Sequence, residues 1–134
     1  MAKIMLSGFI WLLLTGLMLS PSTLLAAEAA ITVTKAQSGQ TIALKVGDIV
    51  QIELPTRGGT GYSWLVNTPG APYLKLMSQT TRAVGETRPG SPVMQVWRFQ
   101  AKEEGETEIN LAYYRPWEGI GKARDHFRIK IRIQ

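Results

Sequence analysis

The sequence predicts an all-β fold, an immunoglobulin-like antiparallel β-sandwich of seven to eight strands without a disulfide. Three observations predict it. After the N-terminal segment, apolar residues recur with a period of two, and short turn signals separate the alternating segments. No stretch of useful length has the period of an amphipathic helix, and the chain contains no cysteine. Seven or eight such segments in a domain of roughly a hundred residues match a sandwich, with a barrel as the alternative.

The first four strands are short. Residues 31–35 and 41–46 are β-branched and apolar, and glycine-containing turns follow each of them at Ser38-Gly39 and Gly47-Asp48. In residues 50–54, valine, isoleucine and leucine alternate with glutamine and glutamate, which indicates one buried face. Residues 62–66 form the fourth candidate.

The last four strands include the clearest ones. Residues 73–77 follow the Pro69-Gly70 turn, and residues 96–101 alternate tryptophan, phenylalanine and alanine with valine, arginine and glutamine, of which Val96 departs from the polar pattern. Residues 108–113 follow a turn at Glu104-Gly105 and place isoleucine, leucine and tyrosine on one face. In residues 126–133, phenylalanine and three isoleucines alternate with histidine, arginine and lysine.

The N-terminus is typical of a secretory signal peptide. Lys3 precedes eleven mostly apolar residues at 9–19, and small residues follow at 26–30. The apolar run is shorter than the ~20 residues of an ordinary membrane span. We therefore expect a leader at 1–27 that is cleaved within 26–30, and one domain at 28–134 in the periplasm or outside the cell. An uncleaved anchor is the alternative.

Composition excludes several kinds of chemistry. The 134 residues include no cysteine and one histidine, His126, so a Cys–His pair and a usual zinc site cannot be assembled. A serine triad would need His126, which we expect on the solvated face of the last strand. The net charge of +5 comes from dispersed cations rather than a basic patch, which argues against nucleic-acid binding. We expect no enzyme activity, no cofactor and no metal.

Three loops are richer in glycine, proline and aromatic residues than plain turns require. The first spans 55–61 and has three glycines within four residues, which lets the backbone approach another surface closely. The second spans 84–92 and contains two prolines. The third spans 114–119 and places an arginine and a tryptophan beside a proline, the residue types that dominate interface hot spots.

These loops resemble those of the chagasin family of cysteine-protease inhibitors. The resemblance rests on Thr60-Gly61-Tyr62-x-Trp64, a later glycine-containing loop, and Arg115-Pro116-Trp117 after an Asn-Leu-x-Tyr strand. Similar residues also stand at Gly39, Gly47-Asp48, Leu54-Pro55, Gly105 and Asn110-Leu111, so the resemblance covers nearly all of the expected domain.

The resemblance implies an immunoglobulin-like sandwich whose three loops reversibly fill the active-site cleft of a papain-like cysteine protease. Thr60 and Gly61 would lie against the catalytic cysteine, Arg115 and Trp117 would anchor one side of the cleft, and Gly90 with its neighbours would contact the other. The protease-binding residues implied are Gly59, Thr60, Gly61, Tyr62, Arg88, Gly90, Arg115, Pro116 and Trp117. We expect a monomer without stable membrane association once the leader is removed.

Two loops depart from the family pattern. The first usually begins Asn-Pro-Thr, where this chain has Arg57-Gly58-Gly59, and the middle one usually reads Gly-x-Gly-Gly, where it has Gly90-Ser91-Pro92-Val93. Restoring Asn-Pro-Thr would be expected to stiffen the loop and tighten binding by ~1–2 kcal/mol. The altered loops leave two alternatives. One is a module that binds a glycan through Tyr73, Tyr114 and Trp117, or a protein other than a protease. The other is an enzyme that uses His126.

Overall fold

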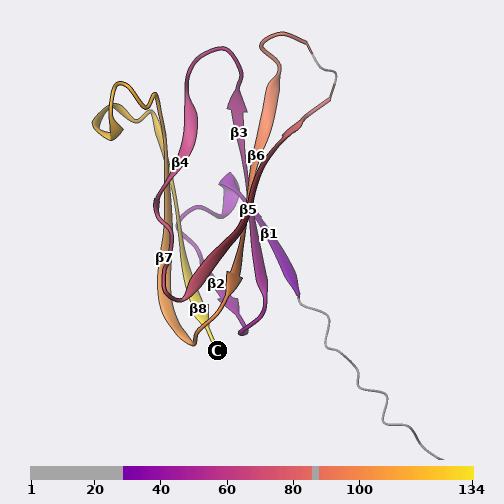
Figure 1. Cartoon of the computed structure of the whole chain (residues 1–134), viewed down its shortest axis with the longest axis vertical. Helices are drawn as coiled ribbons and strands as arrows, with labels where there is room; N and C mark the ends of the chain where they lie inside the picture. The colour runs from indigo at the N-terminus through magenta and orange to yellow at the C-terminus, as the bar shows by residue number, and fades with distance from the viewer. Residues whose placement is uncertain (1–28, 86–87) are drawn as a thin grey trace, which may run out of the picture.

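The structure, a computed structural model, describes residues 29–85 and 88–134. Within these residues eight strands form two four-stranded sheets packed face to face (Figure 1). The expected leader lies outside the described residues. The strands are β1 (Ala30–Thr34), β2 (Thr41–Leu44), β3 (Ile49–Arg57), β4 (Ser63–Thr68), β5 (Leu74–Ala83), β6 (Pro92–Ala101), β7 (Gly105–Tyr114) and β8 (Asp125–Ile133). The predicted sandwich is confirmed, and the barrel alternative is wrong.

The strand order explains how the chain closes the sandwich. The first sheet has the order β1-β3-β6-β5 and the second has the order β2-β8-β7-β4. Because β1 and β2 are edges of different sheets, the short 3₁₀ helix η1 (Lys35–Gln37) carries the chain between the two sheets. Both edge strands pair in parallel, β1 with β3 and β2 with β8, which the expectation of a purely antiparallel sandwich missed.

The core lies between the two inner faces, where the alternating apolar residues were expected. The first sheet contributes Val33, Val50, Ile52, Leu54, Leu74, Trp97, Phe99 and Ala101, and the second contributes Leu44, Trp64, Ile109, Leu111, Phe127, Ile129, Ile131 and Ile133. Each large side chain buried in this way contributes about 1.5–3 kcal/mol relative to exposure. Apolar packing therefore joins the sheets in a chain without cysteine.

Two strands of the first sheet are longer than the sequence pattern predicted. β3 continues through Pro55 to Arg57, which pairs with Pro92 at the start of β6. A proline is tolerated there because β1 ends its pairing with β3 at Glu53, which leaves the end of β3 as an edge. β5 extends to Ala83, and nearly all of its side chains are exposed, so no apolar alternation marks it.

The connections divide between the two ends of the sandwich. Loop β3–β4 (58–62), the described residues of loop β5–β6 (84–85 and 88–91) and loop β7–β8 (115–124) lie at the same end, and turns 45–48, 69–73 and 102–104 lie at the other (Figure 1). In the described part of the chain, no helix is long and apolar enough to cross a membrane. The fold thus gathers the three unusual loops on one surface, which we call the loop end.

Candidate functional site

The first loop is shaped by its own threonine. The Thr60 hydroxyl donates to the Arg57 carbonyl at 3.0 Å and accepts from the Tyr62 N–H at 3.3 Å. Gly59 and Gly61 both have φ +79°, a left-handed conformation that L side chains rarely adopt. The single hydroxyl proton of Thr60 is used in the bond to the Arg57 carbonyl. Toward a partner, the Thr60 hydroxyl oxygen can therefore only accept a hydrogen bond.

The third loop begins with a tight turn. The Glu118 N–H donates to the Arg115 carbonyl at 3.0 Å, and Pro116 occupies the second position of this turn, where its fixed φ is suitable. The Arg115 guanidinium also pairs with the Glu118 carboxylate at 3.1 Å. The turn therefore fixes both the backbone and the arginine before any partner arrives.

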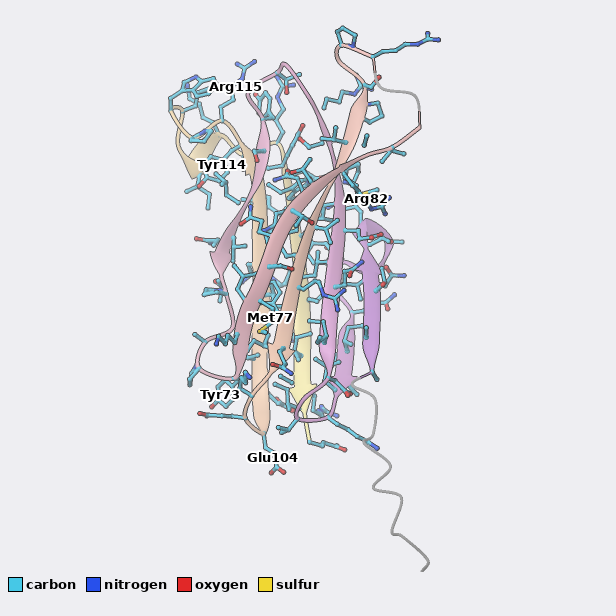
Figure 2. All side chains as sticks on the ribbon, turned by 45° about the vertical axis from the view of Figure 1, so that its right-hand side comes forward. Tyr73, Met77, Arg82, Glu104, Tyr114 and Arg115 are labelled. Carbon is cyan, nitrogen blue, oxygen red and sulfur yellow. The ribbon has the colours of Figure 1, made fainter. Side chains whose placement is uncertain are left out.

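Arg115 connects the third loop to the first. Its Nε donates to the Thr60 carbonyl at 2.9 Å, and its guanidinium carbon lies 4.6 Å from the centre of the Tyr62 ring. Figure 2 shows Arg115 at the loop end, close to Tyr114. The resemblance implied that Arg115 is an anchor for a partner, whereas in the structure its guanidinium makes contacts within the loop end.

Trp117 lies over the first loop and remains largely exposed. A Cβ built on Gly61 would come within 2.2 Å of the Trp117 ring, so only glycine fits at position 61 while the ring stays there. The Trp117 side chain is nevertheless 72% exposed. Gly61 and Trp117 therefore form one surface, with the indole as its prominent apolar group.

A layer of aromatic and polar side chains supports this surface. The Tyr113 ring lies 5.4 Å from that of Tyr62 and 5.1 Å from that of Trp64. The Tyr113 hydroxyl accepts from the Thr56 hydroxyl at 3.3 Å and from the Arg57 N–H at 3.4 Å. Tyr113 was expected only as a strand residue, because strand alternation does not show that its hydroxyl reaches the base of a loop.

A buried hydrogen-bond network joins the two sheets beneath the loops. The Gln95 side chain, on β6, accepts from the Trp64 N–H at 2.9 Å and donates to the Ser63 hydroxyl at 3.1 Å. The Trp64 indole donates to the Pro55 carbonyl at 2.9 Å. A buried hydrogen-bond network whose donors and acceptors are all paired favours a single side-chain arrangement. This network therefore fixes the ends of β3 and β4 from which the first loop extends.

The middle loop is a second tight turn. The Ser91 N–H donates to the Arg88 carbonyl at 3.0 Å, the Arg88 N–H donates to the Ser91 hydroxyl at 3.1 Å, and Gly90 has φ +78°. A Cβ on Gly58 would lie 4.0 Å from the Ser91 carbonyl, so the middle loop comes near the first loop there. The other described residues of this loop lie apart from the other two loops (Figure 1).

The residues of the two alternative functions lie in different parts of the structure. Tyr73 lies at the opposite end of the sandwich from Tyr114 (Figure 2), where its ring packs close to Gly105. The three aromatic residues expected for glycan stacking therefore do not share one platform. His126 is exposed on the outer face of β8, as expected, and lines a hollow of about 140 Å³.

The fold is a β-sandwich in which hydrogen bonds and ring contacts join the first and third loops at one end. A model of the chagasin family of peptidase inhibitors, I42, matches residues 43–131. Chagasin of Trypanosoma cruzi is 27% identical over 104 residues, covering 75% of this chain and 94% of chagasin. Amoebiasin-2 of Entamoeba histolytica is 32% identical over 89 residues, covering 63% of this chain and 70% of its own length.

A solved structure shares the fold. The cysteine protease inhibitor EhICP2 of Entamoeba histolytica superposes with a TM-score of 0.73 at 24% identity, over 81% of this chain and 98% of that one. Since the family model spans most of the described domain, the chain belongs to the chagasin family of peptidase inhibitors. It is an inhibitor and not an enzyme.

Proposed function

We propose that this protein reversibly inhibits papain-like cysteine proteases by placing its loop end in the active-site cleft. The observation that carries the proposal is the joined surface of the first and third loops, in which Arg115 holds Thr60 and Trp117 covers Gly61. Family membership and the cysteine protease inhibitor of the same fold support the choice of partner.

The geometry suits a loop that approaches a nucleophile without being cut. Gly61 brings no side-chain bulk to the reactive cysteine, and its φ of +79° is unlike the extended backbone of a substrate. Thr60 and Arg115 hold this shape in the free protein, which lowers the ordering cost on binding. Trp117 supplies an exposed apolar anchor, and Gly90 with Arg88 would contact the other side of the cleft.

Steady-state kinetics with papain test the proposal. Raising the substrate concentration should raise the apparent inhibition constant in proportion, because the loop end and the substrate would occupy the same cleft. Trypsin, which has a serine nucleophile, serves as a control and should keep its activity. Inhibition of papain that is independent of substrate would contradict binding in the cleft.

We further propose that residues 1–27 are a cleaved leader and that the monomeric domain acts in the periplasm or outside the cell. Lys3, the apolar run at 9–19 and the small residues at 26–30 support this proposal. N-terminal sequencing of the exported protein should find its first residue between 27 and 30. An intact Met1 would overturn the assignment.

A further inference from the structure

The loop end carries a surplus of positive charge. Residues 84–91, 115–124 and the segment 57–62 contain five cationic side chains and two carboxylates, a formal surplus of three positive charges. The cations are Arg57, Arg88, Arg115, Lys122 and Arg124, and the carboxylates are Glu118 and Glu86, the latter outside the described residues.

The opposite end has the reverse balance. Its turns at 45–48, 69–73 and 102–104 contain two lysines and three carboxylates, among them Glu104, which Figure 2 shows at the far tip. The protein is therefore polarised along its long axis. Charges that served only solubility would be spread over both ends of the sandwich.

Three of the loop-end cations remain available to a partner. Arg57, Lys122 and Arg124 are exposed, and no carboxylate of the described residues pairs with any of them. Glu118 is engaged, since it pairs with Arg115 at 3.1 Å, and so is Asp125, which lies just beyond the third loop at the start of β8 and pairs with Lys35 at 2.7 Å. Arg124 also lies 4.6 Å from the centre of the Tyr62 ring, which fixes its charge beside the first loop.

We propose that the loop end is built for a papain-like protease with an acidic rim around its cleft, and that the charge accelerates association. This inference rests on the proposed function and names the chemistry of its partner. Complementary charge raises association rates by about 10- to 1000-fold at low salt and fixes orientation before contact. Because Arg57, Lys122 and Arg124 lie at the same end of the sandwich as Gly61 and Trp117, attraction to the rim would turn this end toward the cleft mouth.

Stopped-flow association with a protease that has an acidic cleft rim tests the inference. One variant carries Arg57→Gln and Lys122→Gln, and a control carries Lys45→Gln and Lys102→Gln, which change the net charge equally at the opposite end. The wild-type rate constant should fall about tenfold as salt rises from about 20 to about 500 mM. At low salt the loop-end variant should associate several-fold more slowly, and the control should match the wild type.

A protease variant whose rim carboxylates are replaced by amides completes the design and should remove most of the salt dependence. The proposed function would stand and this inference would be wrong if inhibition persists but the association rate constants do not change with salt. The same holds if both double variants slow association equally. If neither protease is inhibited at any salt concentration, the proposed function fails and the inference falls with it.

Discussion

At Arg115 a single side chain connects two loops that are far apart in the sequence. Its Nε bond to the Thr60 carbonyl and its position over the Tyr62 ring use the planar guanidinium, whose geometry lysine does not share. We therefore propose that Arg115 positions the first loop. The sequence marked it as important, but an arginine beside a proline and a tryptophan gives no sign of which way its guanidinium points.

Replacing Arg115 by lysine tests this role. Arg115→Lys keeps the charge but loses the hydrogen bond to Thr60, so inhibition should weaken about tenfold, or about 1.4 kcal/mol. Glu118→Gln is the control, because it removes only a partly exposed ion pair and should change inhibition little. Inhibition constants and melting temperatures are measured together. An unchanged inhibition constant for Arg115→Lys would show that the loops need no such connection.

Trp117 should act in binding rather than in folding. Because its side chain is 72% exposed, Trp117→Ala should weaken inhibition by ~2 kcal/mol or more with little change in melting temperature. Ile120→Ala, an exposed apolar residue of the same loop, is the control and should have a small effect on both. A large fall in the melting temperature of Trp117→Ala would instead make the indole a structural residue.

Among the elements, the first loop is where the structure most changes the expectation from sequence. Gly59 has φ +79°, which a β-branched residue rarely adopts, so restoring Asn-Pro-Thr would place threonine in a strained conformation. Arg57 is part of β3, and its N–H bonds to Tyr113. The expected gain in affinity therefore requires a different loop shape, and simple restoration of the family pattern should not produce it.

The adjacent glycines of this loop should respond oppositely to alanine. Gly58 has no positive φ, and a Cβ there meets only the Ser91 carbonyl at 4.0 Å, so Gly58→Ala should stabilise by ~0.4–1 kcal/mol. Gly59→Ala should destabilise by ~1–2 kcal/mol, because alanine is strained at positive φ. Urea unfolding of both variants measures these changes, and equal effects would argue against the described loop conformation.

Strands with one buried face could be predicted from the sequence. Strand segments without a buried face could not. Phe127 to Ile133 alternate into the core as expected, because one inner face imposes a period of two. The second half of β5 has no buried face and left no such pattern. The loops were identified by composition, but their mutual contacts, such as Arg124 with Tyr62, join residues whose spacing carries no signal.

In the molecule as a whole, the sandwich fixes the positions of the loops at its ends. Two sheets joined by apolar packing place every unusual loop at one end, and the buried Gln95 network fixes the support beneath the first loop. Three such loops can cover a standard interface of ~800 Å² per partner. A disulfide is therefore not needed to present a preformed binding surface.

In our proposal the loop end blocks a papain-like protease and is not consumed. The most direct test mixes equimolar purified protein and active papain, follows protease activity over a day, and records the mass of the inhibitor at each time. We predict that activity falls at once, that it returns on dilution, and that the inhibitor keeps its full mass. Cleavage within 58–62, or full activity at about micromolar inhibitor, would contradict it.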